Sequence, residues 1–482
     1  MCIRDRSIID PFLGTGTFVS RLLQSEIIPP EQLEHKYLHE IFANEIVLLS
    51  YYIASINIEQ VYHQIQAERG QDQGYLEFPG ITLTDTFQLR EGEGQLAGIG
   101  DFQANLERVK RQREAPIRVV VMNPPYSAGQ KSANDNNQNL KYPQLDARIE
   151  KTYVARSSAT NKNSLYDSYF RALRWASDRV GEEGIIAFVS NSSFIDGNTA
   201  DGVRLSWAQE FSDIYIYNLR GSIRGKMGEA AAQEGGNVFP IMTGVAITIL
   251  VKEKDASSRP CRIHYAEVDD YLARQEKLDL LTRETSIAGT EFEQIIPNAH
   301  GDWINQRDER YLEFQEMGNK RSKGKANTPA IFQNYSRGLA TTRDAWCYNF
   351  SRQAVESNMQ RMINNYNQEV SSGHNRSQVN EDQTWVSWGG ELDKELERGV
   401  KLQLRRNCLQ QSIYRPFTKQ SVYFERVINE RVYQIPQIFP TPKQPNLAIG
   451  PIGERRREFS VFISTLLPDL EMTSKAQWFP LY

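Results

Sequence analysis

The sequence predicts an α/β protein whose first half is a doubly wound, mostly parallel sheet and whose second half is a mixed α+β domain. Apolar runs typical of strands alternate with amphipathic runs typical of helices, and this alternation indicates a parallel sheet with helical crossovers. The clearest strand patterns are residues 8–9, 41–45, 81–87, 119–122, 184–190, 214–219 and 244–251. From about Lys254 the alternation stops, and Arg, Asn, Gln and aromatic residues become more frequent. We therefore predict two domains, residues 1–253 and residues 254–482.

The composition is ordinary for a globular protein of two or three domains, with 482 residues of which 40% are hydrophobic. The net charge is -4, so any contact with nucleic acid must come from local basic patches. The four cysteines are scattered without paired spacing, which fits a reducing cytosol and predicts neither disulfides nor a metal site. A secretory signal and a run of about 18 apolar residues are both missing, so we expect a cytoplasmic protein.

The strand pattern at residues 119–122 is followed at once by Asn123-Pro124-Pro125-Tyr126. Proline cannot donate to a β-ladder and pushes the preceding residue into extended geometry, so the strand ends in a rigid corner. The corner offers backbone carbonyls, the Asn123 amide and the Tyr126 ring, which together suit a planar amino group that is held by acceptors and stacked. A nucleobase amine fits this description. The alternative is an ordinary turn, because Asn-Pro and Pro-Pro are common turn formers.

A second corner lies upstream, where the strand pattern Ile8-Ile9 leads into Asp10-Pro11-Phe12-Leu13-Gly14-Thr15-Gly16. The apolar residues after Gly16 have helical spacing, so the glycines join a strand to the N-terminus of a helix. The loop has neither the Lys-Ser/Thr of a P-loop nor a third glycine in dinucleotide spacing, and phosphate binding is therefore disfavoured. The glycines instead allow the backbone to approach a bound cofactor.

With the two corners in this order, the sequence resembles the N6-adenine DNA methyltransferases of the gamma motif order. The resemblance implies a Rossmann-like methyltransferase sheet, S-adenosyl-L-methionine as the cofactor, and catalysis without a metal. Under it, Glu45 takes ribose hydroxyls and Asp85 accepts the amino group of the cofactor adenine. The structural alternatives for these two acids are a solvated helix-start glutamate and a strand-end aspartate that caps a turn. The implied cofactor-binding residues are Asp10, Pro11, Gly14, Gly16, Glu45, Asp85 and Phe87.

The same resemblance implies how the corner after residue 122 acts on a target adenine. The base is flipped out of the duplex, and the carbonyls of the Asn123 side chain and the Pro124 backbone accept its amino hydrogens. Phe239 matches the aromatic residue that stacks on the base opposite Tyr126, and the alternative is a core phenylalanine. The implied catalytic residues are Asn123, Pro124, Pro125, Tyr126 and Phe239.

A long polar segment, residues 127–163, follows the catalytic corner. Long segments of this kind in a compact domain are usually functional or disordered. The position of this segment favours a loop that folds over DNA, with Lys131 among the residues available for phosphates. Disorder without a role is the alternative.

The second half of the chain carries signals of a DNA-reading domain. Basic clusters lie at residues 320–325, 405–406 and 455–457, in a region that is rich in Trp and Tyr. Residues 335–346 and 414–420 resemble a narrower group, the single-polypeptide Type ISP restriction-modification family, in which an adenine methylase precedes a C-terminal specificity domain that recognises the target. The predicted DNA contacts are Lys131, Arg337, Arg343 and Arg415.

The resemblance also implies what the chain acts on and what accompanies it. The expected partner is double-stranded DNA, and full-length family members carry nuclease and translocase parts that have no counterpart here. We therefore expect a fragment, cut short at its end and with unusually exposed apolar lining near Pro11 and Phe12. Two alternatives stay open. One is methyl transfer to another amine, such as cytosine N4 or a protein glutamine, and the other is a DNA-binding specificity module with an inactive methylase core.

Overall fold

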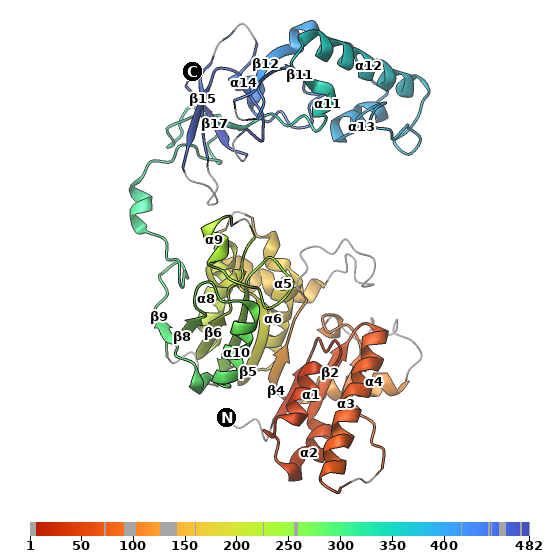
Figure 1. Ribbon diagram of the computed structural model, residues 1–482, viewed down its shortest axis with the longest axis vertical. Coiled ribbons are helices and arrows are strands. Elements are labelled where there is room, and N and C mark those ends of the chain that lie inside the picture. Colours follow the sequence, from red (N-terminus) through yellow and green to blue (C-terminus); the bar gives the residue numbers. More distant parts are fainter. Residues whose placement is uncertain are drawn as a thin grey trace. The chain divides into compact units, whose positions relative to one another are not determined.

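The structure, a computed structural model, describes all residues except 1–5, 72–73, 91–102, 126–141, 160, 225, 255–258, 416, 442–443, 445, 453–458, 473–474 and 482. Tyr126 and Lys131 therefore lie outside the described residues. The chain divides into two compact units, Met1–Arg307 and Asp308–Tyr482 (Figure 1). Each unit has its own hydrophobic core.

A nine-stranded sheet forms the centre of the first unit. Its strands are β1 (Ser7–Asp10), β2 (Ile41–Glu45), β3 (Ile81–Leu83), β4 (Ile117–Met122), β5 (Gly184–Asn191), β6 (Asp213–Asn218), β7 (Val245–Lys252), β8 (Arg262–Glu267) and β9 (Glu293–Ile295). Their order in the sheet is β3-β2-β1-β4-β5-β7-β6-β8-β9. β7 runs antiparallel to β5 and β6, β9 runs antiparallel to β8, and the other neighbours are parallel. The predicted doubly wound, mostly parallel sheet is confirmed.

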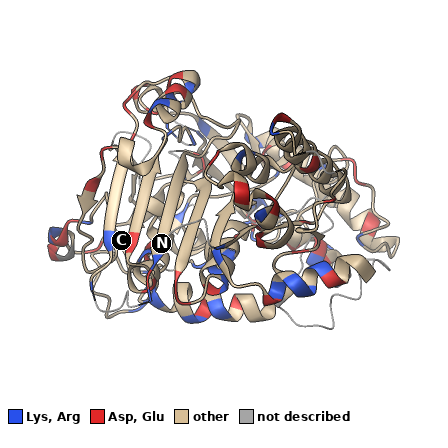
Figure 2. Cartoon of the chain, turned by 90° about the horizontal axis from the view of Figure 1, so that it is seen from below, with Lys and Arg blue, Asp and Glu red and all other residues tan. Residues whose placement is uncertain are grey.

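Helices cover both faces of the sheet, because its parallel strands are joined by crossovers. The helices of this unit are α1 (Thr17–Gln24), α2 (Leu33–His35), α3 (Leu48–Glu68), α4 (Gln103–Glu114), α5 (Pro143–Ile149), α6 (Ser168–Arg179), α7 (Ser193–Asp196), α8 (Asp201–Glu210), α9 (Glu229–Ala232) and α10 (Arg274–Glu284). α1 and α3 share one core with the sheet, which includes Ala54 and Ile58. α5, α6 and α8 share a larger core with it, which includes Leu173 and Trp207. Figure 2 shows the charged residues mainly on helices and loops, whereas the strands consist mostly of uncharged residues.

The order of the strands reverses between β1 and β4, because β2 and β3 follow β1 on one side and β4 starts the other side. Ile8 of β1 accordingly pairs with Ile41 of β2 and with Val119 of β4. In a doubly wound sheet this reversal leaves a crevice beyond the carboxyl ends of the two central strands, where ligands bind. Both predicted corners, the glycine loop after β1 and Asn123 after β4, lie at this edge.

The first unit extends beyond the boundary predicted between residues 253 and 254. β8 pairs with β6 from Asp213↔Arg262 to Asn218↔Glu267, and β9 adds to β8. α10 packs against the same part of the sheet. The sheet therefore continues to Ile295, and the two units divide after Arg307. The sequence pattern ended too early because β8 mixes charged and apolar residues, as a half-exposed strand near the edge of a sheet does.

The second unit is a mixed α+β fold, as predicted. Its elements are β10 (Ser336–Arg337), α11 (Asp344–Cys347), β11 (Tyr348–Asn349), α12 (Arg352–Ser371), α13 (Gly390–Glu397), β12 (Leu409–Ile413), β13 (Lys419–Tyr423), α14 (Ile435–Ile438), β14 (Ala448–Pro451), β15 (Val461–Ser464), β16 (Leu467–Pro468) and β17 (Gln477–Pro480). They form two four-stranded sheets, in the orders β10-β17-β14-β15 and β11-β13-β12-β16. One core joins both sheets to α12 and includes Met359, Val422 and Trp478.

Within the described part of the chain, no helix combines the length and the hydropathy that a membrane span requires. The same residues contain no cluster of three or more His, Cys, Asp or Glu side chains arranged to hold a metal ion. Cys261, Cys347 and Cys408 are free thiols.

Candidate active site

Four polar side chains gather at the carboxyl edge of the first sheet, because the ends of its parallel strands meet there. Asp10 is the last residue of β1, and Glu45 is the last residue of β2. Asp85 lies shortly after β3, and Asn123 follows β4 directly. The sequence predicted each position from an apolar run that ends in a polar residue. Together they define a candidate site at the reversal of strand order.

The loop between β1 and α1 makes a tight turn that depends on glycine at two positions. Gly14 and Gly16 have φ angles of 58° and 87°, in the left-handed region that favours glycine. A Cβ atom on Gly16 would also stand 3.2 Å from Cγ1 of Ile58. α1 begins directly after Gly16, so the loop joins a strand to a helix N-terminus as predicted.

Glu45 fixes the glycine loop through hydrogen bonds from the backbone. Its Oε2 accepts from the N–H of Gly14 at 2.8 Å. Its Oε1 accepts from the N–H groups of Ile46 and Val47 at 2.8 and 2.7 Å, just before α3 begins. Glu45 is therefore buried at the end of β2, which differs from the solvated helix-start glutamate that was the alternative. Its contact with a ribose stays a prediction.

A buried polar network ties the loop to β2 and β3. Asn44 Nδ2 donates to Thr86 Oγ1 at 3.0 Å, and Thr86 Oγ1 donates to the carbonyl of Pro11 at 2.5 Å. Thr82 Oγ1 donates to Asn44 Oδ1 at 2.7 Å. Sequence reasoning missed these three side chains. The signal in the sequence is a polar residue within a strand pattern, as at Asn44 and Thr82, whereas Thr86 follows β3; that all three are buried is seen in the structure.

Asp10 is buried at the end of β1, with 3% of its surface exposed. Its Oδ1 accepts from the N–H of Phe12 at 3.1 Å, whereas its Oδ2 has no hydrogen-bond partner among the described residues. Burial raises the pKa of Asp10 to about 7; the Phe12 N–H lowers that pKa and the nearby Glu45 carboxylate raises it. A buried carboxylate oxygen without a partner is unfavourable, so the position suits a cationic or hydrogen-bond-donating group of a ligand.

Asp85 is paired with a tyrosine that the sequence analysis did not single out. Tyr142 OH donates to Asp85 Oδ2 at 2.9 Å, and the N–H of Phe87 donates to Oδ1 at 2.9 Å. The Phe87 ring lies 5.2 Å from that of Tyr142 and 5.5 Å from that of Phe12, measured between centroids. Burial raises the pKa of Asp85. Asp85 therefore caps the turn, and its contact with a cofactor adenine stays a prediction. The signal for Tyr142 was a lone aromatic residue in a polar run, directly before Pro143.

The corner after β4 has the shape that its prolines predict. β4 ends at Met122. Asn123 is exposed, Pro124 is buried and Pro125 is half-buried, so the prolines anchor the corner and the Asn123 amide stands at the edge of the sheet. Tyr126 lies outside the described residues, and its stacking role stays a prediction.

Phe239 lies on the surface of the first unit, 36% exposed, which excludes the alternative of a core phenylalanine. Asn237 fixes the turn that carries it. Asn237 Nδ2 donates to the carbonyls of Gly221, Ile241 and Thr243 at 3.0, 3.0 and 2.8 Å, and its Oδ1 accepts from the Phe239 N–H at 3.0 Å. The ring is thus held on an ordered turn, and its stacking on a base stays a prediction.

The expectation of unusually exposed lining near Pro11 and Phe12 is wrong. Pro11 is buried and Phe12 is half-buried. The reason is that Phe12 packs on Phe87, and the loop is held by the hydrogen bond from Thr86 to the carbonyl of Pro11. A cavity of about 260 Å³ lies instead between α1 and the sheet, and Asp10 and Val121 are among the residues that line it.

Arg343, which was predicted to contact DNA, is a core residue of the second unit with 2% exposure. Its Nε donates to the carbonyl of Ser387 at 2.9 Å, and its Nη1 donates to the carbonyl of Ile428. The guanidinium therefore joins separate segments of the unit and is not available to a phosphate, so this prediction is wrong. The burial of Arg343 could not be predicted from the sequence motif, because arginine is rarely buried.

The other predicted DNA contacts differ in their exposure. Arg415 is half-buried, donates to Asp344 Oδ2 at 3.1 Å and lies 3.9 Å from Asp469 Oδ1. Arg337 is exposed at the end of β10. Lys131 lies outside the described residues. Arg337, Arg415 and Lys131 stay predicted DNA contacts, with Arg415 already engaged in ion pairs.

Comparison with protein families matches residues 330–482 to the Type ISP C-terminal specificity domain. Comparison with curated proteins finds no match.

Solved structures match this chain over its full length. The ATP-dependent Type ISP restriction-modification enzyme LlaBIII, bound to DNA, is 42% identical with a TM-score of 0.82, and the match covers 99% of this chain and 32% of that one. A nuclease-deletion mutant of the Type ISP enzyme LlaGI, in complex with a DNA substrate mimic, is 39% identical with a TM-score of 0.81, covering 100% and 39%. DrdV, in complex with DNA, is 37% identical with a TM-score of 0.80, covering 100% and 46%.

The chain thus spans between 32% and 46% of the length of these relatives. Its first unit has the mostly parallel sheet with both corners at the reversal of strand order, and its second unit contains the matched specificity domain. The chain is therefore related over its whole length to the Type ISP restriction-modification enzymes, and its residues 330–482 are a Type ISP C-terminal specificity domain.

Proposed function

We propose that the first unit is a site-specific DNA methyltransferase, which transfers a methyl group from S-adenosyl-L-methionine to N6 of a flipped adenine, and that the second unit selects the site. The observation that carries this proposal is the position of the two corners, which follow β1 and β4 on either side of the reversal of strand order. A cofactor bound over the first corner and an amine held at the second meet in one crevice. The similarity to Type ISP enzymes supports the same assignment.

The residues after β1 fit S-adenosyl-L-methionine. Oδ2 of Asp10, which has no hydrogen-bond partner among the described residues, suits a cationic group of the cofactor, and Gly14 and Gly16 allow the backbone to come close. Glu45 offers a carboxylate at the end of β2, and the Phe87 ring offers apolar surface. When bound, the cofactor supplies an electrophilic methyl group, and the protein holds and orients it. The residues proposed to do so are Asp10, Pro11, Gly14, Gly16, Glu45, Asp85 and Phe87.

The corner after β4 is proposed to act on the amine of the target base. The side-chain carbonyl of Asn123 and the backbone carbonyl of Pro124 accept the two amino hydrogens. As N6 attacks the methyl carbon, the bond from that carbon to the sulfonium sulfur would break and S-adenosylhomocysteine would leave. The two acceptors stabilise the positive charge that grows on N6, which then loses one proton to solvent. Flipping the base costs a few kcal/mol, and stacking on Tyr126 and Phe239 returns about 1–3 kcal/mol for each ring.

We propose double-stranded DNA as the partner and a restriction-modification system in the cytoplasm as the setting. The three relatives above are described as complexes with DNA or with a DNA mimic. In that setting, nuclease and translocase parts belong to the same full-length polypeptide.

Incubating the chain with labelled cofactor and mixed-sequence double-stranded DNA is expected to place the label in N6-methyladenine. Hydrolysis of the DNA to nucleosides followed by chromatography identifies the modified base. Label in N4-methylcytosine would replace the adenine assignment. Label that is released by protease and resists nuclease would indicate a protein amine. Site-selective DNA binding without any transfer of label would support the alternative of a DNA-binding specificity module with an inactive methylase core.

The affinity for S-adenosyl-L-methionine is expected to rise with pH up to about pH 7 and then to level off. The pKa of Asp10 in the free protein is about 7, so below this pH the carboxyl is neutral and must lose its proton to pair with a cationic cofactor. Each pH unit below that pKa is expected to weaken binding up to about tenfold. Calorimetric titrations between about pH 5.5 and 7.5 measure the effect, since the cofactor's amino group stays largely charged over this range.

Asp10→Asn is expected to bind the cofactor weakly with a nearly flat pH profile. Asp279→Asn, which changes an exposed carboxylate on α10, is the matched control and should keep the parent profile. An unchanged pH profile in Asp10→Asn would show that another group titrates.

A further inference from the structure

α12 has two chemically different faces. The buried face joins the core of the second unit through Val355, Met359, Met362, Ile363 and Tyr366. The residues on the opposite face recur at helical spacing and are polar. Its exposed residues include Gln353, Ser357, Gln360, Arg361 and Asn364. The rigid packing of the first face fixes the position of the second.

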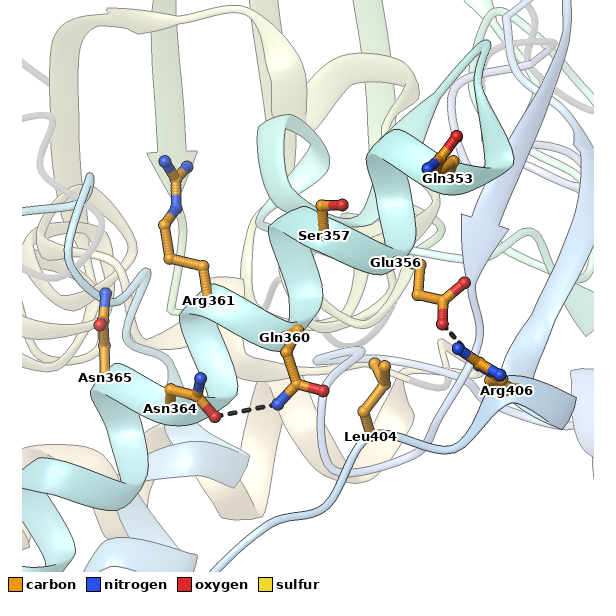
Figure 3. A pocket seen from close by; sticks show the side chains of 9 residues that line it. All are labelled: Gln353, Glu356, Ser357, Gln360, Arg361, Asn364, Asn365, Leu404 and Arg406. Atoms are coloured by element: carbon orange, nitrogen blue, oxygen red, sulfur yellow. Dashed lines mark hydrogen bonds and ion pairs between the residues drawn. The ribbon is translucent and has the colours of Figure 1, made fainter.

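A shallow groove of about 610 Å³ lies along the polar face, between α12 and the segment 402–406 (Figure 3). Two sets of contacts hold this segment against the helix. The Asn367 amide accepts from the N–H of Leu402 and donates to its carbonyl, both at 2.8 Å. Arg406 Nε donates to Glu356 Oε1 at 2.6 Å. The groove therefore exists before any ligand binds.

The groove contains amide groups that are already oriented. Gln360 Nε2 donates to Asn364 Oδ1 at 2.9 Å, so the two side chains lie side by side along the helix (Figure 3). This bond uses one donor and one acceptor of the pair. The carbonyl and the second N–H of Gln360, and both N–H groups of Asn364, can bind a further group. Glu356, the carboxylate that lines the groove, is neutralised by its ion pair with Arg406.

Arg361, which also lines the groove, is supported by an aromatic ring. Its guanidinium carbon lies 4.7 Å from the centroid of Trp346. The indole N–H of Trp346 donates to the carbonyl of Gln383 at 3.0 Å, which fixes the ring. An arginine supported in this way loses less conformational freedom when it binds a partner.

We infer that α12 is the base-reading element of the specificity domain. Its amide face enters the major groove of the target DNA, where Gln360 and Asn364 recognise adenine and Arg361 recognises guanine. Amide side chains pair with N6 and N7 of adenine, and arginine pairs with O6 and N7 of guanine. Amides also contact phosphates, which carry no sequence information, but a side chain that offers a donor and an acceptor together matches the edge of adenine. The inference rests on the proposed function, because it names the element that selects the site.

The test is to sequence the sites that the 482-residue chain methylates in double-stranded DNA with randomised positions. Gln360→Ala combined with Asn364→Ala is expected to lose the preference for one base pair of the site, by about ten- to a hundredfold in relative methylation rate. Cofactor affinity and melting temperature should stay unchanged. Gln403→Ala is the matched control, because Gln403 is an exposed amide on the neighbouring segment that does not line the groove.

A second variant separates base reading from a structural effect. Gln360→Glu replaces the amide with a carboxylate, which accepts from N4 of cytosine. It is expected to change the preferred base at the same position of the site rather than to abolish selection.

Each result decides between the two proposals. A parent chain that methylates no DNA overturns the proposed function, and this inference with it. A parent chain with a defined site, and variants with the identical site, overturn the inference alone. A third outcome is a variant that loses methylation equally at every sequence while its melting temperature is unchanged. That result would assign the polar face of α12 to DNA-backbone binding or to a protein contact, and it would likewise overturn the inference.

Discussion

Replacing Asn123 with alanine is expected to slow methyl transfer at least about a hundredfold while leaving the affinity for S-adenosyl-L-methionine within about twofold. The Asn123 carbonyl is proposed to accept a hydrogen of the target amine, and this contact strengthens as positive charge grows on nitrogen. Asn123 follows β4, whereas Asp10 and Glu45 end β1 and β2, so the loss falls on kcat rather than on cofactor binding. Single-turnover rates at saturating DNA and calorimetric titration of the cofactor measure the two quantities.

Asn123→Asp is the control for this experiment, because it keeps an acceptor oxygen in the same place. It is expected to retain more activity than the alanine variant, which separates the loss of the acceptor from damage to the corner. An alanine variant with more than about a tenth of the parent rate would contradict the role of Asn123, since a group that stabilises the transition state contributes more than that.

The two corners were predictable because each depends on neighbouring residues. A β-branched run followed by two prolines ends a strand wherever it occurs, and β4 ends at Met122 accordingly. The glycine loop likewise depends on positive φ at Gly14 and Gly16. The two corners share one edge of the sheet because β1 and β4 are parallel. The alternation of strands and helices in the sequence predicts this parallel sheet.

The support around these corners was not predictable, because it comes from residues far away in the sequence. Tyr142 reaches Asp85 across 57 positions, and Thr86 reaches the carbonyl of Pro11 across 75. Such contacts depend on how the strands are ordered and on their register. A single sequence shows polar residues at buried positions without showing their partners.

Three of the predicted DNA contacts, Arg337, Arg343 and Arg415, came from the segments that resemble the Type ISP family, and one of the three is wrong. Arg343 stabilises the core, although its segment resembles the specificity domain. α12, in contrast, carries few charges and was not predicted to contact DNA, although its apolar residues have clear helical spacing. Net charge indicates where a phosphate backbone is attracted, whereas bases are also read by amides, which add no charge.

Ending the chain after Arg307 is expected to abolish site-selective methylation while keeping a folded first unit whose cofactor affinity stays within about threefold of the parent. The reason is that the nine strands and both corners lie before this point, and the proposed base-reading helix lies after it. Ending the chain after Val251 is expected to prevent cooperative folding. Thermal unfolding, cofactor titration and sequencing of methylated sites measure the three outcomes.

The difference between the two end points follows from what residues 252–307 bury. Trp303 is 2% exposed, and its ring lies 6.4 Å from that of Trp207. Arg204 is 1% exposed; its Nε donates to the carbonyl of Gly301 at 2.6 Å, and its guanidinium lies 3.6 Å from Asp302 Oδ1. Removing a partner from a buried ion pair costs about 3–5 kcal/mol, out of a typical stability of about 5–15 kcal/mol. The shorter chain also loses β8 and β9 from the edge of the sheet.

A matched pair of chains, residues 1–307 and residues 1–251, therefore tests two assignments at once. If the shorter chain unfolds cooperatively and binds the cofactor as tightly as the longer one, β8, β9 and α10 are dispensable and the boundary first predicted near residue 253 is the correct one. If the longer chain methylates the same sites as the parent, selection lies in the first unit. That result would remove the second unit, and α12 with it, from DNA recognition.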